Sequence, residues 1–403
     1  MKKLLLTILF ILVYVSLTAQ SKPYVLLVSF DGFRWDYLNR GITPNLEKIK
    51  TEGVSALSFR PSFPSKTFPN HQSIITGMYP AHHGIFANYF FDPFSNEIYR
   101  LGDTAAVTNP RWYLGEAFWE TAERQGITTA SYFWPGSELK LNYRRPTYFE
   151  TYTHQRPYIE RVEGVINWLK LPQEKRPRFI TLYFHETDDK GHKFGPNSKE
   201  CNEAIKLLDE LAGMLMHKLD EIKMKDSVNV IFLSDHGMTE VSPERVINVE
   251  KILEGYNCEF LDESSLMTIE PPKDKLKEVY DILKKNENHY KVYFRHQVPE
   301  HFHFQNNPLI PTIVVIPEIG WNVLTNKGMK RFSGDHSVGN HGFDNHHLDM
   351  HGIFLAAGPS FKKSYKTGTL WNVDIYPLLC KIFGVMPRAN IDGKLERIEF
   401  ILK

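Results

Sequence analysis

Acidic side chains follow three apolar segments of the sequence, either directly or within a few residues. These segments and acids are Tyr24–Phe30 with Asp31, Arg178–His185 with Asp188, and Val228–Leu233 with Asp235. Carboxylates brought close together repel one another and raise each other's pKa values. A bound divalent cation removes that conflict, so the pattern indicates a metal site wherever these three acids meet.

Histidines lie beside the same acids. His192 is four residues after Asp188, His236 follows Asp235 directly, and His341 lies in a loop before another apolar segment. Mixed Asp and His ligands suit zinc and similar first-row metals. Six such ligands are enough for two ions with open positions for substrate. Three further carboxylates remain alternatives from spacing alone: Asp189, Asp344 and Asp349. The doublets His82-His83 and His346-His347 are expected to be solvated or to face substrate.

The elements that must position these residues are short apolar runs typical of buried strands. Beside the three segments above, Thr128–Phe133 and Gly352–Ala357 are weaker strand candidates. Helical spacing of apolar residues predicts helices over Leu114–Arg124 and Ser198–Ile222. Such alternation predicts an α/β fold with a mostly parallel sheet covered on both faces. Ligands of open parallel sheets bind beyond the carboxyl ends of the strands, so the acids are expected at one edge.

Composition excludes several classes of protein. The 403 residues carry 48 Lys and Arg against 47 Asp and Glu, and 42% are hydrophobic. This balance argues against disorder and against a generic nucleic-acid binder, so no nucleic-acid polymer is expected as a partner. Residues 254–325 predict a small inserted α+β subdomain. Its expected elements are a helix over Lys273–Lys285 and strands at Tyr290–Phe294, Thr312–Ile316 and Trp321–Leu324.

The first twenty residues are typical of a signal peptide. Lys2 and Lys3 precede the apolar run Leu4–Leu17, and Ala19 offers a small residue for cleavage. The run is shorter than the ~20 residues that span a bilayer. We therefore predict a signal peptide over residues 1–20, a mature domain over 21–403, and a periplasmic or secreted protein without a membrane span. The three cysteines are too few for a disulfide scaffold, and their pairing stays open: Cys201, Cys258 and Cys380.

A possible nucleophile lies in a Pro-rich segment at residues 61–70. Thr67 comes just before His71–Gly77, where a helix is predicted to begin. A helix N-terminus favours an anion, and a threonine hydroxyl becomes a good nucleophile only when a metal or base activates it. On spacing alone, the plainer interpretation of Thr67 or Ser65 is a cap in a loop.

Taken in order, several stretches resemble the nucleotide pyrophosphatase/phosphodiesterase family of the alkaline phosphatase superfamily, in a compact bacterial form limited to the catalytic domain. The stretches are VSFDGFRWDYL (28–38), TPNLEKI (43–49), PSFPSKTFPNHQSIITGMYPAHHGIFAN (61–88), FWPGSE (133–138), ETDDKGHKFGP (186–196), LSDHGM (233–238) and GNHGFDN (339–345). The resemblance implies an alkaline-phosphatase-like fold and a phosphodiesterase catalytic domain over residues 21–403.

The resemblance also implies roles for single residues. One zinc ion would be held by Asp31, Thr67, Asp235 and His236, and a second by Asp188, His192 and His341. Thr67 would form a covalent phosphothreonyl ester, and Asn88 would contact the non-bridging phosphoryl oxygens. The family's spacing selects Asp188 over Asp189. The family often has proline where this chain has Thr187, which predicts a less rigid loop.

The implied substrate is a nucleotide phosphodiester or phosphoanhydride, for example ATP cleaved to AMP and pyrophosphate. The residues expected around the base are Phe68, Trp134, Pro135 and Tyr152, with Tyr148 competing for the place of Tyr152. A choline-phosphate or lysophospholipid phosphodiesterase, to which Glu138 would contribute, is the alternative. A phosphomonoesterase would need a cation near the nucleophile, for which Lys66 is the candidate. A non-catalytic metal-binding protein is more remote, and we expect a monomer.

Overall fold

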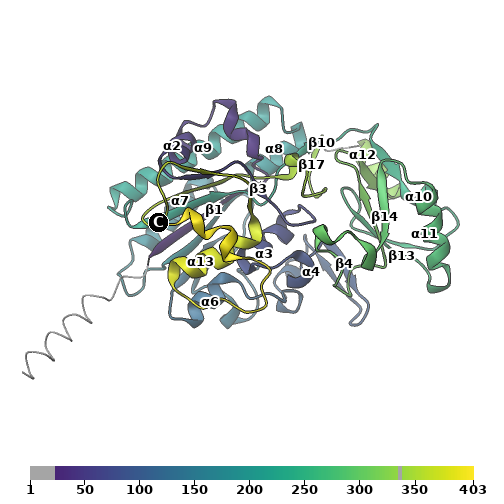
Figure 1. Ribbon diagram of the computed structural model, residues 1–403, viewed down its shortest axis with the longest axis horizontal. Coiled ribbons are helices and arrows are strands. Elements are labelled where there is room, and N and C mark those ends of the chain that lie inside the picture. The colour runs from purple at the N-terminus through teal and green to yellow at the C-terminus, as the bar shows by residue number, and fades with distance from the viewer. Residues whose placement is uncertain (1–22, 335–337) are drawn as a thin grey trace, which may run out of the picture.

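The computed structural model is built around an eight-stranded central sheet (Figure 1). Its strands, in spatial order, are β19 (Tyr365–Thr367), β2 (Val54–Ala56), β18 (Phe354–Ala357), β9 (Val228–Leu233), β1 (Tyr24–Phe30), β8 (Phe179–Phe184), β6 (Thr129–Tyr132) and β7 (Tyr148–Glu150). The five strands from β9 to β7 are parallel, and β18 is antiparallel to both of its neighbours. The structure describes residues 23–334 and 338–403, so the predicted signal peptide at 1–20 lies outside the described residues.

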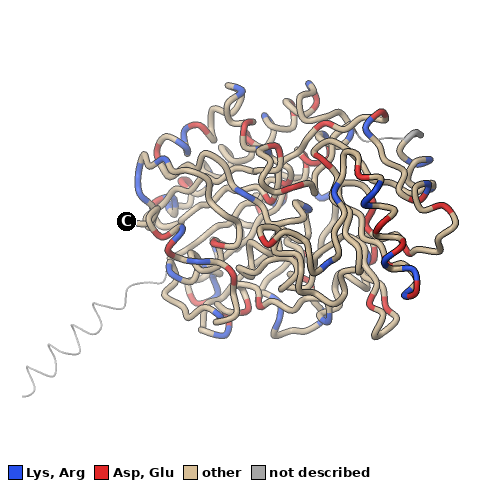
Figure 2. Tube along the Cα trace, turned by 45° about the vertical axis from the view of Figure 1, so that its right-hand side comes forward, with Lys and Arg blue, Asp and Glu red and all other residues tan. Residues whose placement is uncertain are grey.

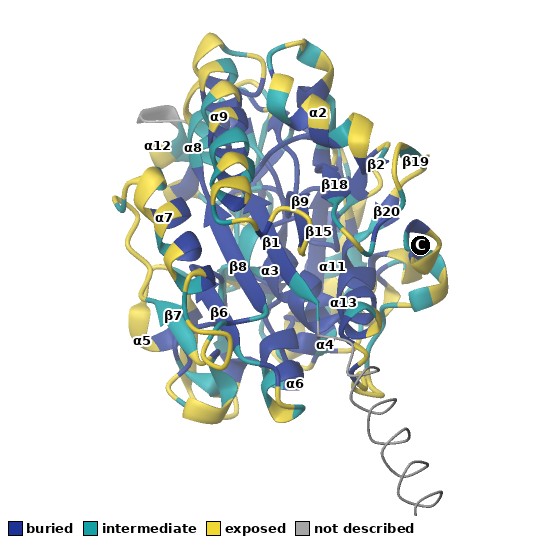
Figure 3. Cartoon of the chain, turned by 90° about the vertical axis from the view of Figure 1, so that its left-hand side faces the viewer, coloured by how far each residue is buried: buried dark blue, intermediate teal, exposed yellow. Residues whose placement is uncertain are grey.

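Strand β1 is apolar on both faces because helices cover both sides of the sheet. Leu26 and Val28 pack into one hydrophobic cluster, and Val25 and Leu27 pack into another. The first cluster includes α2 (Pro44–Glu52), α7 (Tyr158–Leu169) and α9 (Lys199–Glu221). The second includes α3 (Thr67–Thr76), α6 (Phe118–Arg124) and α13 (Ile375–Phe383). The sheet is therefore buried between two layers of helices (Figure 3), as expected for parallel strands.

The apolar runs predicted the central strands well. β1 and β9 have the predicted bounds, and α9 is one residue shorter at each end than its predicted range. Helix α6, in contrast, begins at Phe118 and not at Leu114. Leu114 is 64% exposed, and its N–H donates to the carbonyl of His83. The backbone there bonds to the last residue of helix α4 (Pro80–His83), a long-range contact that helical periodicity does not reveal.

A second, four-stranded sheet lies beside the central one (Figure 1). Its antiparallel strands are β12 (Glu259–Leu261), β13 (Met267–Glu270), β15 (Ile313–Pro317) and β14 (Tyr290–Phe294). Helices α10 (Val249–Ile252) and α11 (Leu276–Lys285) share a hydrophobic cluster with it. The expected strands at 290–294 and 312–316 are present. The boundary of an insertion at 254–325 stays a prediction, and β11 (Val246–Asn248) lies before it while pairing with β16 (Asn322–Leu324).

Shorter strands and helices make up most of the remaining regular structure. They are β3 (Phe59–Arg60) paired with β20 (Leu370–Trp371), β10 (Thr239–Glu240) paired with β17 (Gly339–Asn340), β4 (Tyr89–Asp92) paired with β5 (Glu97–Arg100), and the helices α4 (Pro80–His83), α5 (Thr104–Val107), α8 (Glu186–Phe194) and α12 (Asn326–Gly334).

Acidic and basic residues are interspersed along the chain (Figure 2), in keeping with the near-zero net charge. The three cysteines are free thiols. No helix within residues 23–334 and 338–403 has both the length and the apolar character needed to cross a bilayer.

Candidate active site

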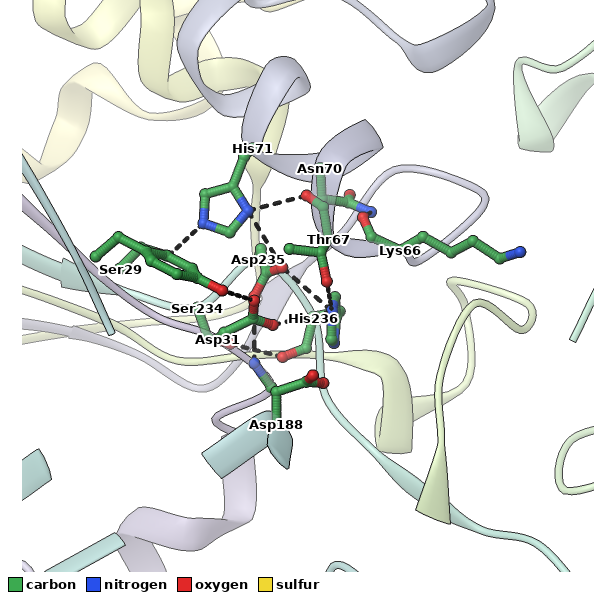
Figure 4. A network of polar contacts seen from close by, with 12 residues as sticks. Ser29, Asp31, Lys66, Thr67, Asn70, His71, Asp188, Ser234, Asp235 and His236 are labelled. Atoms are coloured by element: carbon green, nitrogen blue, oxygen red, sulfur yellow. Dashed lines mark hydrogen bonds and ion pairs between the residues drawn. The ribbon is translucent and has the colours of Figure 1, made fainter. Parts of the chain in front are cut away.

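The carboxyl ends of β1, β8 and β9 bring three aspartates to one edge of the central sheet. Asp31 follows β1 directly, Asp235 follows β9 after one serine, and Asp188 lies in the first turn of α8, which follows β8. β1 pairs with both β8 and β9, so the three strand ends are adjacent. Figure 4 shows the three side chains gathered around His236 and Thr67. The sheet thus places the acids as the sequence pattern predicted.

The first half of the cluster is centred on the imidazole of His236. Its Nε2 atom lies 3.2 Å from Asp31 Oδ1, 3.2 Å from Asp235 Oδ2 and 3.1 Å from Thr67 Oγ1. Asp31, Asp235 and His236 are buried, whereas Thr67 is half-buried. The hydroxyl of Thr67 is therefore the more accessible group in a buried set of ligating atoms.

The second half of the cluster is centred on Asp188. Its Oδ1 atom lies 3.4 Å from His192 Nε2 and 3.5 Å from His341 Nε2. Asp189 instead has Oδ2 3.2 Å from His154 Nε2, on a different side of α8. Because i and i+4 lie on one face of a helix, the spacing of Asp188 and His192 is the one that brings both to the same point.

Each of the three histidines presents Nε2 to these carboxylates because its Nδ1 contacts a backbone carbonyl. The partners are Gly237 O at 2.8 Å for His236, Gly339 O at 2.9 Å for His192 and Ser65 O at 2.8 Å for His341. An Nδ1–H donated to a carbonyl sets the tautomer in which neutral Nε2 carries a lone pair. Burial lowers the pKa of His192 and His341, so the Nε2 lone pairs of these two residues face carboxylate oxygens, an arrangement that a bound cation stabilises.

The electrostatics of the acids agree with this geometry. Burial and the charge of Asp31 raise the pKa of Asp188 well above its usual range, and the same two causes raise the pKa of Asp235. Burial alone would raise the pKa of Asp31 as well, but the adjacent charged imidazole of His236 outweighs it and lowers the pKa to about 2. The site therefore crowds more negative charge into a buried volume than its own histidines neutralise.

The donor set fits divalent metal ions. Three buried carboxylate oxygens have no hydrogen-bond partner among the described residues: Asp31 Oδ1, Asp188 Oδ1 and Asp235 Oδ2. The ligand atoms of Asp188, His192 and His341 all lie within 4.8 Å of one another, and so do those of Asp31, Asp188 and His236. Carboxylate and imidazole donors at this density are typical of zinc and similar metals.

Thr67 is the first residue of helix α3, four residues earlier than the predicted helix start at His71. Pro69 lies in the first turn, where a missing N–H costs no helical hydrogen bond. The side chain of Asn70 secures the preceding loop: its Oδ1 accepts from Ser62 N–H, and its Nδ2 donates to the carbonyl of Pro64. The hydroxyl of Thr67 therefore sits at a helix N-terminus, where an anion is stabilised.

Two residues that sequence reasoning missed support the acids from behind. His71 contacts Asp235 Oδ2 at 3.3 Å through Nδ1 and Ser29 Oγ at 2.9 Å through Nε2 (Figure 4). The phenol of Tyr183 donates to Asp31 Oδ2 at 2.5 Å. The sequence contains only weak indications of these two residues. His71 lies four residues after Thr67, and Tyr183 lies near the end of the strand β8 that leads to Asp188.

The other candidate ligands lie elsewhere. Asp349 accepts from the hydroxyl of Thr239, Asp344 accepts from the backbone of His346, and His82 pairs with Asp392. The remaining doublet members are His83, which is buried beside Ser73, and His347, which accepts from Asp349 N–H. At the proline-free position, the Thr187 hydroxyl donates to the carbonyl of Asp31. Thr187 is the buried second residue of helix α8 and not part of a loop, and this bond ties the start of that helix to the end of β1.

The residues expected around a nucleotide base differ in accessibility. Phe68 is half-buried, and Tyr152 is 44% exposed. Trp134 is only 3% exposed, and its indole N–H donates to the carbonyl of His71. The ring of Trp134 therefore packs in the core and does not present a face for stacking. Pro135 is half-buried, and its carbonyl accepts from Gln72.

A cavity of about 790 Å³ opens beside the ligands and extends to the second sheet. The half-buried Asn88 lines it together with His192 and His341, and Asn88 Oδ1 has no hydrogen-bond partner among the described residues. This volume suits a small-molecule ligand. An amide at its wall is placed to contact a substrate oxyanion.

Comparison with known proteins identifies relatives over nearly the whole chain. The family model for type I phosphodiesterase/nucleotide pyrophosphatase matches residues 25–344. Bis(5'-adenosyl)-triphosphatase enpp4 of Xenopus laevis is 34% identical over 96% of this chain and 83% of its own. Human ectonucleotide pyrophosphatase/phosphodiesterase family member 5 is 36% identical over 94% of this chain and 78% of its own.

A solved structure shares the fold. Murine ectonucleotide pyrophosphatase/phosphodiesterase 5, an inactive variant in complex with AMP, superimposes with a TM-score of 0.89 at 34% identity. The match covers 95% of this chain and all of the murine chain. This likeness confirms the fold class that the sequence predicted.

Proposed function

The chain belongs to the type I phosphodiesterase/nucleotide pyrophosphatase family, and from that premise we propose that it hydrolyses nucleotide phosphodiester and phosphoanhydride bonds through a covalent threonine intermediate. ATP cleaved to AMP and pyrophosphate is the representative reaction. The observation that carries the proposal is the contact of Thr67 Oγ1 with a buried cluster of Asp and His side chains at a helix N-terminus. The AMP bound by the murine relative supports a nucleotide substrate.

We propose two zinc ions as the cofactors. One set of ligands is Asp31, Thr67, Asp235 and His236, and the other is Asp188, His192 and His341. When bound, two such ions supply Lewis acidity that favours the ionised threonine hydroxyl and stabilises charge on the leaving oxygen.

The following roles are proposed for residues of the chain itself. Thr67 Oγ1 forms a bond to phosphorus while the bond from phosphorus to the leaving oxygen breaks. Water then displaces the threonine oxygen, and a proton returns to Thr67. Asn88, at the cavity wall, contacts a non-bridging oxygen, and the N-terminus of α3 stabilises the anionic phosphoryl group. Tyr183 and His71 hold Asp31 and Asp235 in place through their hydrogen bonds and ion pairs.

The test of this function is a comparison of kcat/KM for four substrate classes on the purified enzyme. They are ATP, a chromogenic nucleotide diester, a choline phosphodiester and a phosphate monoester. We expect the two nucleotide substrates to be the fastest. Glu138, the residue that a choline pocket would use, accepts a hydrogen bond from the backbone N–H of Tyr152. A choline diester turned over faster than both nucleotides would replace the nucleotide assignment with the alternative.

Replacing Phe68 with alanine tests the base contact. Phe68 directly follows the nucleophile, is half-buried and packs partly against a hydrophobic cluster, and we propose that its exposed part stacks on the base. Base stacking on an aromatic side chain is worth ~1–3 kcal/mol, and we expect kcat/KM for a nucleotide diester to fall by about 5- to 100-fold. A simple aryl phosphate diester, which lacks a base, should lose much less. Equal losses for both substrates would show that Phe68 acts through packing alone.

We further propose that the protein is exported, to the periplasm or beyond the cell, and acts as a monomer. Export is supported by the signal-like residues 1–20 and by relatives whose names place them among ectonucleotidases. Sequencing of the mature N-terminus would check it, since export with cleavage predicts a start near Gln20.

A further inference from the structure

A buried ion pair joins the lysine that precedes Thr67 to the second sheet. Lys66 Nζ lies 2.7 Å from Asp262 Oδ2, and each side chain is only 7% exposed. The two residues are 196 positions apart in the sequence. The lysine that precedes the candidate nucleophile therefore has a dedicated partner from a different part of the fold.

The segment that carries Asp262 is held by contacts of the two residues that follow it. Asp262 has a φ of 54°, in the left-handed region, on the connection that follows β12. Glu263 Oε2 accepts from the backbone N–H and the hydroxyl of Thr325, at 2.9 and 2.7 Å. Ser264 and Val323 exchange two backbone hydrogen bonds. These contacts hold the backbone on the C-terminal side of Asp262, from which its side chain reaches Lys66.

Lys66 belongs to the same cavity as the candidate metal ligands. It lines the cavity together with Asn88, His192 and His341. Its stem packs so closely on Gly342, next to His341, that a Cβ on that glycine would lie 2.9 Å from Lys66 Cε. The ammonium group is thus confined to the wall of the space in which a phosphoryl group would react.

The buried position of Lys66 sets it apart from the other cations lining this cavity. Arg100, Lys327 and Arg331 are exposed, so solvent and salt screen their charges. A buried ammonium is screened much less. If Lys66 were unpaired, its charge would favour the ligand with the greater negative charge.

Phosphate esters differ in the charge that such an ammonium would attract. A diester carries one negative charge on its non-bridging oxygens at neutral pH, whereas a monoester carries nearly two because its second pKa is about 6. Pairing with Asp262 cancels the positive charge of Lys66 without removing the side chain. The ion pair has no net charge, so it does not favour the monoester over the diester.

We propose that Asp262 is a specificity-determining residue, which pairs with Lys66 and thereby withholds from phosphate monoesters the cation that would favour them over diesters. The inference rests on the proposed phosphodiesterase function. Asp262 acts through Lys66, so it is a positioning residue and not one that contacts substrate.

The test compares two substrates that differ by one methyl group, p-nitrophenyl phosphate and methyl p-nitrophenyl phosphate. Asp262→Asn keeps the shape and a hydrogen-bond acceptor while leaving the ammonium uncompensated. We expect it to raise the monoester-to-diester ratio of kcat/KM on the order of tenfold. Lys66→Met leaves the carboxylate uncompensated and should lower the ratio. The double variant restores neutrality and should return the ratio to within about threefold of wild type.

Opposite signs for the two single variants separate a charge effect from a structural one, because loss of packing lowers both activities together. Inhibition by inorganic phosphate gives a second readout, since Asp262→Asn should bind this anion more tightly. An unchanged ratio in both single variants, with circular dichroism and melting temperature like wild type, would overturn the inference. If the wild-type protein itself hydrolysed neither ester nor ATP, the proposed function would fail instead.

Discussion

Replacement of Thr67 by alanine is expected to abolish nearly all turnover of a chromogenic nucleotide diester, with a loss in kcat on the order of 10³-fold or more. The reason is that no other hydroxyl occupies the same place. Thr67 Oγ1 is 3.1 Å from His236 Nε2, whereas Ser65 Oγ donates to the carbonyl of Phe343. The variant should fold normally, because Thr67 is half-buried at the start of α3 and its hydroxyl caps no backbone N–H there.

Two matched variants make the result specific. Thr67→Ser keeps a hydroxyl at the same atom and should retain measurable turnover, while Ser65→Ala removes the competing hydroxyl and should stay near wild type. The measurements are initial rates, mass spectrometry of a trapped phosphoryl enzyme, and thermal unfolding of each variant. Wild-type rates for Thr67→Ala combined with an inactive Ser65→Ala would move the nucleophile to Ser65. The inactive murine relative crystallised with AMP is a threonine-to-alanine variant, which agrees with the loss of turnover expected for Thr67→Ala.

Removal of bound metal by a chelator should have a comparably large effect on both activity and stability. Activity should fall to background and return on addition of zinc, with about two metal ions per chain by elemental analysis. The melting temperature should fall as well, since a ligand that binds only the folded state stabilises it by RT ln(1 + [L]/Kd). In this protein the effect is reinforced because three buried carboxylate oxygens have no hydrogen-bond partner among the described residues.

Histidine variants provide the controls for that experiment. His341→Ala removes a group that faces Asp188 and should lower the metal content per chain. His82→Ala removes a histidine that pairs with Asp392 instead and should leave the metal content unchanged. Full activity in a chain shown by elemental analysis to be free of metal would refute the metal-dependent mechanism.

Sequence patterns located the central strands and the residues that meet at their ends, because both depend on local chemistry. Burial on both faces of a parallel sheet requires a continuous apolar run, as in Tyr24–Phe30 and Val228–Leu233. The chain leaves each parallel strand at the carboxyl edge of the sheet, so the residues that follow the strands indicate which side chains meet at that edge. The same logic failed for Leu114–Phe118, where a hydrogen bond from Leu114 to the end of helix α4 replaces the predicted helical pattern.

By itself, therefore, the sequence determined the family, the fold class and the group of acids and histidines that assemble at one edge. Only the tertiary structure decided which nitrogen of each histidine faces the acids, that Trp134 packs in the core, and that Lys66 is neutralised by Asp262. The physical reason is the distance along the chain between partners. A strand or a motif consists of consecutive residues and can be recognised from them. The carboxylate that pairs with Lys66 lies 196 positions away, and contacts of this kind leave no local pattern in the sequence.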